Sequence, residues 1–126
     1  MDNERISANF LRKEFACKCG CGRENISGDL VSRLQEVRDL LGLPMTITSG
    51  VRCILHNTKV NGSSKSAHLP DEFGIGHAVD IACESSAYRQ RLLSVAFKVF
   101  DRVGVAKTFV HLDVHPGKTA GVCWVY

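Results

Sequence analysis

The sequence lacks several features that would point to a membrane or a nucleic acid as a partner. No apolar run approaches the roughly 20 residues that a membrane-spanning helix needs. No run of Lys and Arg stands out, and the formal net charge is only +3. A nucleic-acid-binding surface normally needs a denser concentration of positive charge. We therefore expect neither a membrane nor a nucleic acid among the partners.

The start of the chain also lacks the pattern of a secretory leader. Residues 1–5 are polar and acidic, and no continuous apolar block follows them. A signal peptide would need a positively charged start and an apolar stretch. We therefore expect synthesis in the cytoplasm without a signal peptide.

What the sequence does contain is typical of one globular unit. Its 126 residues are 44% hydrophobic and 23% charged, enough for a sizeable core and too few for two ordinary domains. Repeats and low-complexity segments are absent. We expect a single domain over 1–126, in which residues 1–28 form an irregular N-terminal arm with a Cys/Gly loop.

Six cysteines are present, and the reducing compartment favours thiols over disulfides. They are Cys17, Cys19, Cys21, Cys53, Cys83 and Cys123. The segment 17–21 lacks the spacing of a zinc knuckle and has no second pair that matches it. We interpret its thiols as structural, with a second metal or a disulfide as the alternatives.

Apolar spacing predicts two helices and about four or five short strands. Leu30, Leu34, Val37 and Leu41 recur at helical spacing, and residues 88–99 repeat the pattern. A shorter helix or an irregular turn is expected over 54–60, and Gly104 is expected in a turn. Expected strands lie at 45–48, 77–82, 109–114 and 122–126. The order of these elements predicts an α+β fold, with helices packed on one side of a small antiparallel or mixed sheet.

Two histidines and an aspartate lie where a metal site could form. Asp80 and His111 each occupy a polar position on an expected strand whose opposite face is aliphatic. His68 precedes Asp80 in a polar loop. Imidazole nitrogen and carboxylate oxygen suit zinc, and catalytic zinc sites use three protein ligands and keep one position open. The alternative is that each side chain is an ordinary surface or hydrogen-bonded group.

These motifs resemble those of the zinc D-alanyl-D-alanine carboxypeptidase family. The matching motifs are Ser66-x-His68, Gly76-x-Ala78-Val79-Asp80, and Phe109-Val110-His111-Leu112-Asp113, with Ser49-Gly50-Val51-Arg52 ahead of them. That family shares its metal site with D-Ala-D-Ala dipeptidases, phage L-Ala-D-Glu endolysins and the hedgehog signalling domain. The resemblance implies a fold of the hedgehog and DD-peptidase type.

Carried over residue by residue, the resemblance gives each of these side chains a role. His68, Asp80 and His111 would be the ligands of one zinc ion per chain. Arg52 would hold the substrate's carboxylate or polarise the scissile carbonyl, and Ser66 would hydrogen-bond the substrate backbone. The alternatives are a surface ion pair for Arg52 and ordinary loop hydrogen bonding for Ser66.

The general base is a point at which this sequence departs from the family. Many members have an acid three residues before the last histidine or a histidine two before it, whereas Thr108 and Phe109 stand there. Asp113 shares a strand face with His111, and we expect it to act as the catalytic base. The alternative is that the Asp113 carboxylate only orients His111.

An insertion is the second departure. Eleven residues, 69–79, separate His68 from Asp80, about five more than is usual in the family. We expect residues 70–74 to loop out and to border the substrate cleft.

The resemblance implies a zinc metallopeptidase that hydrolyses peptidoglycan stem peptides, as a D-Ala-D-Ala carboxypeptidase or an endolysin-type endopeptidase. The alternatives are a non-catalytic zinc-bearing module that binds the cell wall, and a cysteine-rich interaction domain without metal. We expect a monomer that acts on the cell wall, with holin-type release as one route out of the cytoplasm.

Overall fold

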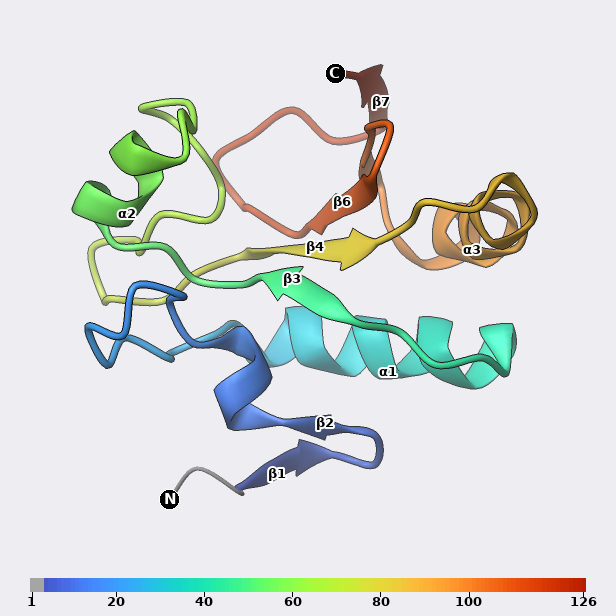
Figure 1. Ribbon diagram of the computed structural model, residues 1–126, viewed down its shortest axis with the longest axis horizontal. Coiled ribbons are helices and arrows are strands. Elements are labelled where there is room, and N and C mark those ends of the chain that lie inside the picture. The colour runs from blue at the N-terminus through green and yellow to red at the C-terminus, as the bar shows by residue number, and fades with distance from the viewer. Residues whose placement is uncertain (1–3) are drawn as a thin grey trace.

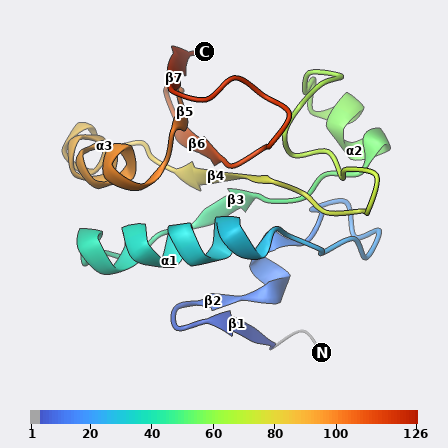
Figure 2. The same ribbon diagram turned by 180° about the vertical axis from the view of Figure 1, so that it is seen from behind.

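The computed structural model describes residues 4–126 and contains a five-stranded sheet with two long helices beside it (Figures 1 and 2). A small two-stranded hairpin precedes it. In chain order the elements are β1 (Arg5–Ser7), β2 (Phe10–Leu11), the 3₁₀ helix η1 (Arg12–Phe15), α1 (Gly28–Leu41), β3 (Ile47–Ser49), α2 (Ile54–Lys59), β4 (Ala78–Ala82), α3 (Ser86–Val99), β5 (Arg102–Val105), β6 (Phe109–Asp113) and β7 (Val122–Val125).

The two long helices begin and end at the residues that their sequences predict. The hydroxyl oxygen of Ser27 accepts a hydrogen bond from the backbone N–H of Leu30 at the start of α1, and Ser85 does the same for Tyr88 in α3. Gly42 ends α1 with a left-handed conformation, φ 68°. Both helices are therefore fixed locally before any packing is considered.

The large sheet is mixed, in the order β3-β4-β6-β5-β7. Neighbouring strands run antiparallel except β5 and β7, which run parallel. Together with the three helices this confirms the predicted α+β class with a mixed sheet. The centre of the sheet is the pair β4 and β6, the two strands on which Asp80 and His111 were predicted to lie.

The sheet has one aliphatic face and one polar face. Side chains from β4, β5 and β6 pack with α1 and α3 into a single core, and these strand residues are Val79, Ile81, Val103, Val110 and Leu112. Their exposure is 0–1%. The short helix α2 lies apart from α1 and α3, at the other end of the molecule (Figure 1). The opposite face of the sheet is therefore left for polar side chains.

One row of cross-strand neighbours runs across that polar face. Its members are Ser49, Asp80, His111, Gly104 and Trp124, each paired with the next in the strand register. Because alternate residues of a strand share a face, this register fixes which side chains meet. The row places the carboxylate of Asp80 directly beside the imidazole of His111.

Two parts of the fold differ from the sequence-based expectation. Gly104 was predicted in a turn, but it lies inside β5, where a Cβ atom would come within 2.6 Å of the Trp124 ring. The absence of a side chain is therefore a packing requirement and not a turn signal. The arm before residue 28 is also less irregular than expected, since it forms β1, β2 and η1; its residues 1–3 lie outside the described part of the chain.

None of the helices within residues 4–126 is long and apolar enough to cross a membrane.

Candidate metal centre

The three predicted ligands meet on the polar face of the sheet. Asp80 and His111 are register partners on β4 and β6. His68 arrives from the loop before β4, where its carbonyl accepts a 2.9 Å hydrogen bond from the backbone N–H of Arg52. One ligand atom from each residue lies within 4.8 Å of the other two. All three side chains are buried, with residue exposures of 2–5%.

Hydrogen bonds on the outer side of each imidazole fix which nitrogen faces the centre. Nδ1 of His68 donates to the carbonyl oxygen of Gly50 at 2.7 Å, and Nε2 of His111 donates to Oδ2 of Asp113 at 2.7 Å. In a neutral imidazole the other nitrogen then carries a lone pair. Nε2 of His68 and Nδ1 of His111 both point at Oδ1 of Asp80, at 3.2 and 3.1 Å.

This donor set fits a metal ion. Two nitrogen lone pairs and a carboxylate oxygen that face one another in a buried space repel unless a cation lies between them. Two imidazoles and one carboxylate are ligands that zinc takes at catalytic sites. The carbonyl and the carboxylate behind the histidines are the partners that orient such ligands in zinc proteins.

Burial and neighbouring groups shift the pKa of each of the three residues. Burial lowers the pKa of His68, so this imidazole is neutral at neutral pH. Burial acts in the same direction on His111, but hydrogen bonds with Asp113 and Asp80 outweigh it and raise the pKa. Burial alone would raise the pKa of Asp80, yet hydrogen bonds with His111 and His68 lower it well below the usual range.

Arg52 contacts the centre itself. Its guanidinium donates to Oδ2 of Asp80 at 3.2 Å, to Oδ1 of Asn57 at 3.0 Å and to the hydroxyl oxygen of Ser49 at 3.0 Å. The side chain is 13% exposed, so this is a half-buried ion pair and not a surface one. Arg52 therefore fixes the second oxygen of Asp80 and lies at the edge of the cleft.

Both carboxylate oxygens of Asp113 accept hydrogen bonds from neighbouring groups. Its Oδ2 accepts from His111, and its Oδ1 accepts from Nε of Arg102 at 2.7 Å and from the backbone N–H of His115 at 3.2 Å. Its side chain is 0% exposed. Burial would raise its pKa, but the hydrogen bonds from His111 and Arg102 lower it. This geometry favours the alternative role, in which Asp113 orients His111; its role as the base stays a prediction.

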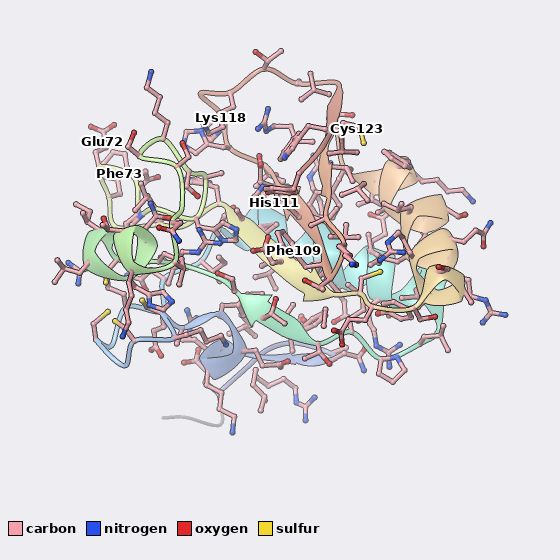
Figure 3. The ribbon with its side chains drawn as sticks, turned by 45° about the horizontal axis from the view of Figure 1, so that its top comes forward. Glu72, Phe73, Phe109, His111, Lys118 and Cys123 are labelled. Atoms are coloured by element: carbon pink, nitrogen blue, oxygen red, sulfur yellow. The ribbon has the colours of Figure 1, made fainter. Side chains whose placement is uncertain are left out.

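A cleft of about 400 Å³ opens over the three ligands. Its walls include the basic side chains of Arg52, Lys65, Arg102 and Lys118 and the aromatic rings of Phe109, Trp124 and Tyr126. Figure 3 shows Phe109 and His111 near the middle of this side of the molecule, with Lys118 on the loop that follows β6. Ser66 also lines the cleft, and its hydroxyl accepts from the backbone N–H of His68 at 3.1 Å.

The comparison with protein families agrees with this centre. The family model described as Peptidase M15 matches residues 8–113, which is most of the chain. The chain belongs to the peptidase M15 family. This is a family of zinc metallopeptidases, and the resemblance inferred from the motifs is thereby confirmed. A search of curated proteins finds no match.

Trp124 and Arg102, which lie beside the centre, were missed by the sequence reasoning. Trp124 lies against His111 with ring centroids 5.3 Å apart, and the guanidinium of Arg102 lies 4.9 Å from the centroid of the Trp124 ring. Asn57 is 3% exposed and links Arg52 to the backbone of Ser63. The pair His56-Asn57 belongs to the segment that resembles the family, but the sequence assigned Asn57 no role. Nothing local marked Arg102 or Trp124, which reach the site through the pairing of β5 with β6 and of β7 with β5.

The insertion, residues 70–74, does not border the substrate cleft as expected. Residues 70–74 fold into a turn around Asp71, whose carboxylate accepts from the backbone N–H groups of Phe73 and Ile75 and bonds Nε2 of His77. Among the described residues that line the cleft, none comes from 70–74. Glu72 and Phe73 lie on the side of α2, away from His111 (Figure 3). The insertion borders a neighbouring cavity, formed with α2 and the cysteine loop.

Proposed function

We propose that this M15 chain is a zinc-dependent peptidase that hydrolyses peptide bonds in peptidoglycan stem peptides. The observation that carries the proposal is the convergence of His68, Asp80 and His111 at the base of an open cleft. A closed structural site would have no such access, whereas a catalytic site must admit substrate. The family supports a peptide-type substrate.

The charge of the cleft supports stem peptides as the substrate class. These peptides carry free carboxylates, and basic side chains line the cleft around the centre, among them Lys65 and Lys118. Arg52 is already beside Asp80, and its planar guanidinium suits a carboxylate or a carbonyl oxygen. Ser66 stands at the rim and would contact the substrate backbone.

A zinc ion in this centre would supply Lewis-acid polarisation of the scissile carbonyl and make water more acidic. The protein's own part is to hold the ligands in place. Asp113 keeps the proton on Nε2 of His111, and the Gly50 carbonyl keeps the proton on Nδ1 of His68. Arg52 holds the second oxygen of Asp80. Trp124 covers one side of His111 and keeps water from it.

Digestion of purified peptidoglycan tests this proposal. Zinc-loaded protein should release D-Ala or cut stem peptides, and the product masses identify the bond. His68→Ala should abolish the products, while His56→Ala, the same chemical change outside the centre, should retain them. Full activity in His68→Ala would contradict the proposal.

A second candidate function is a zinc-bearing module that binds the cell wall without hydrolysis. One observation favours it: Asp80 and Asp113 are the only carboxylates among the described residues that line the cleft, and both are held by hydrogen bonds. Retention on insoluble peptidoglycan with no products at saturating zinc would select this function. In both cases we propose that the protein acts at the cell wall.

A further inference from the structure

Four cysteine sulfurs converge at a second place in the molecule, on the side where α2 lies. The Sγ atoms of Cys17, Cys19, Cys21 and Cys53 all lie within 4.8 Å of one another. Cys19 is 3.4 Å from Cys17 and 3.6 Å from Cys53, measured between sulfurs. Cys17 and Cys53 are buried, whereas Cys19 and Cys21 are exposed.

The loop that carries three of these thiols is built to turn them towards one point. The backbone N–H of Cys17 donates to the carbonyl of Arg23 at 2.8 Å and closes the loop. Gly20 and Gly22 adopt positive φ angles of 83° and 92°. Side-chain-bearing residues rarely adopt that conformation, so the glycines allow the tight curl that brings alternate cysteines together.

The fourth thiol is delivered by a different segment. The backbone N–H of Val51 donates to the carbonyl of Phe15 at 3.0 Å, which lays residues 50–53 against the chain just before the loop. A Cβ atom on Gly50 would lie 2.4 Å from that Phe15 oxygen, so only glycine allows this approach. Figures 1 and 2 show the loop after η1 close to the segment that leads into α2.

We propose that these four cysteines bind a second zinc ion, in a closed structural site separate from the His68–Asp80–His111 centre. Four thiolates around zinc with bonds of about 2.3 Å stand about 3.8 Å apart at the corners of a tetrahedron. The sulfur distances from Cys19 to Cys17 and to Cys53, 3.4 and 3.6 Å, are close to that value. Soft thiolate ligands select zinc over harder divalent cations.

Disulfides explain the arrangement less well. Four cysteines could pair as two disulfides, but bonded sulfurs lie about 2.0 Å apart, whereas Cys19 lies 3.4 and 3.6 Å from its two neighbouring sulfurs and all four cysteines are free thiols. The sulfurs also accept backbone hydrogen bonds, from Cys53 N–H to Cys17 and from His56 N–H to Cys53, both at 3.4 Å. Such donors stabilise thiolates, which is the form that binds metal.

A metal at the thiol site would also hold the segment that contacts the His68–Asp80–His111 centre. Cys53 directly follows Arg52, which donates to Asp80, and Gly50, which accepts from His68, lies in the same segment. A metal that fixes Cys53 to the loop therefore fixes the segment behind two of the three catalytic-centre ligands. The inference does not depend on the proposed peptidase activity.

Metal analysis of the purified, reduced full-length protein tests the inference. We expect two zinc ions per chain in the parent protein and one in Cys19→Ser, Cys21→Ser and the double variant. Cys123→Ser removes an exposed thiol on β7 that is not part of the cluster, and this variant should retain two zinc ions. His68→Ala should retain one zinc ion, the one bound by the cysteines. This result is expected whether or not the protein is a peptidase.

Cobalt substitution gives a second measurement that needs no cysteine variant. Cobalt added to metal-free His68→Ala should give the thiolate-to-cobalt charge-transfer bands and strong visible absorption of a tetrahedral thiolate site. A thiol-modifying reagent should release that metal. Reduced His68→Ala that binds no zinc, or cobalt spectra of that variant without thiolate bands, would overturn the inference.

Discussion

The two clusters of ligand side chains in this protein are built in different ways. His68, Asp80 and His111 are buried, and each makes a hydrogen bond with a neighbouring group outside the centre, namely Gly50, Arg52 and Asp113. The cysteine cluster lies in a loop, with two of its four thiols exposed. The first cluster takes its geometry from strand register, the second from a loop closed by glycines.

This difference has a chemical consequence. Three ligands beside an open cleft leave a coordination position for substrate, whereas four thiolates would complete the coordination of zinc. The first arrangement suits catalysis and the second suits structural support. Substitutions in the first cluster should therefore mainly lower activity. Substitutions in the second cluster should mainly lower stability.

The largest effect is expected from loss of a ligand at the His–Asp–His centre. His111→Ala should lower the peptidase rate by more than about 10³-fold, because the Lewis acid it helps to hold contributes several kcal/mol to the transition state. Stem-peptide hydrolysis at saturating zinc measures this. An unchanged rate would mean that the catalytic metal lies elsewhere.

Loss of a thiol ligand should instead act on stability. Cys53→Ser should lower the free energy of unfolding by about 4 kcal/mol when zinc is present at about 1,000 times its Kd, because the folded state loses a bound ligand. Denaturant titration with and without zinc measures this. Cys123→Ser is the control and should change stability by less than about 0.5 kcal/mol. If Cys53→Ser and Cys123→Ser changed the free energy of unfolding equally, the cysteine cluster would have no stabilising role of its own.

Substitution of Asp113 tests whether this residue orients His111 or acts as the general base. Asp113→Asn keeps the shape but weakens the bond to Nε2 of His111, and we expect zinc affinity to fall by about 10–100-fold. Competition with a chelator measures the affinity. If Asp113 only orients His111, saturating zinc should restore the rate. A rate that stays low with zinc bound would instead identify Asp113 as the base.

Gly104 tests the packing behind His111. Gly104→Ala would place a Cβ atom 2.6 Å from the Trp124 ring, so the ring must move, and we expect a loss of about 1–3 kcal/mol in unfolding free energy. Gly28→Ala is the control, since no atom lies within 4 Å of its added Cβ. A neutral Gly104→Ala variant would show that Trp124 is not fixed against His111.

The smallest effect is expected at Asp71 in the insertion. Hydrogen bonds from His77 and from the Ile75 backbone lower the pKa of this carboxyl to about 2. A lowered pKa stabilises the folded state above the unfolded pKa, here near 3.8, and the stabilisation is lost as the pH falls through about 2. The stability difference between the parent protein and Asp71→Asn should therefore vanish between about pH 4 and pH 2. The peptidase rate should not change, because Asp71 does not line the cleft.

The contrast between the clusters also explains what the sequence could predict. Period-2 alternation predicted that Asp80 and His111 share a polar strand face, and cross-strand pairing then brings them together. The helical spacing of Leu30, Leu34, Val37 and Leu41 predicted α1, and the capping residues Ser27 and Gly42 set its bounds. These signals are local, and the peptidase family motifs strengthened the assignment of His68, Asp80 and His111 as ligands.

Long-range contacts were beyond the reach of the sequence. The thiol cluster was missed because Cys53 joins residues 17–21 only through the pairing of Val51 with Phe15. The strand β5 was missed because a glycine such as Gly104 is typical of a turn. In the structure, the close approach of the Trp124 ring requires a glycine at this position. The place of residues 70–74 depended on Asp71 and His77, a contact within the loop that spacing does not predict.

The central claim is that His68, Asp80 and His111 hold a catalytic zinc ion. Anomalous X-ray diffraction at the zinc edge, on crystals of the zinc-loaded protein, tests it most directly. We predict a peak bounded by Nε2 of His68, Oδ1 of Asp80 and Nδ1 of His111, with a second peak among the four cysteine sulfurs. A zinc-loaded crystal with no peak between the two histidines would contradict the account.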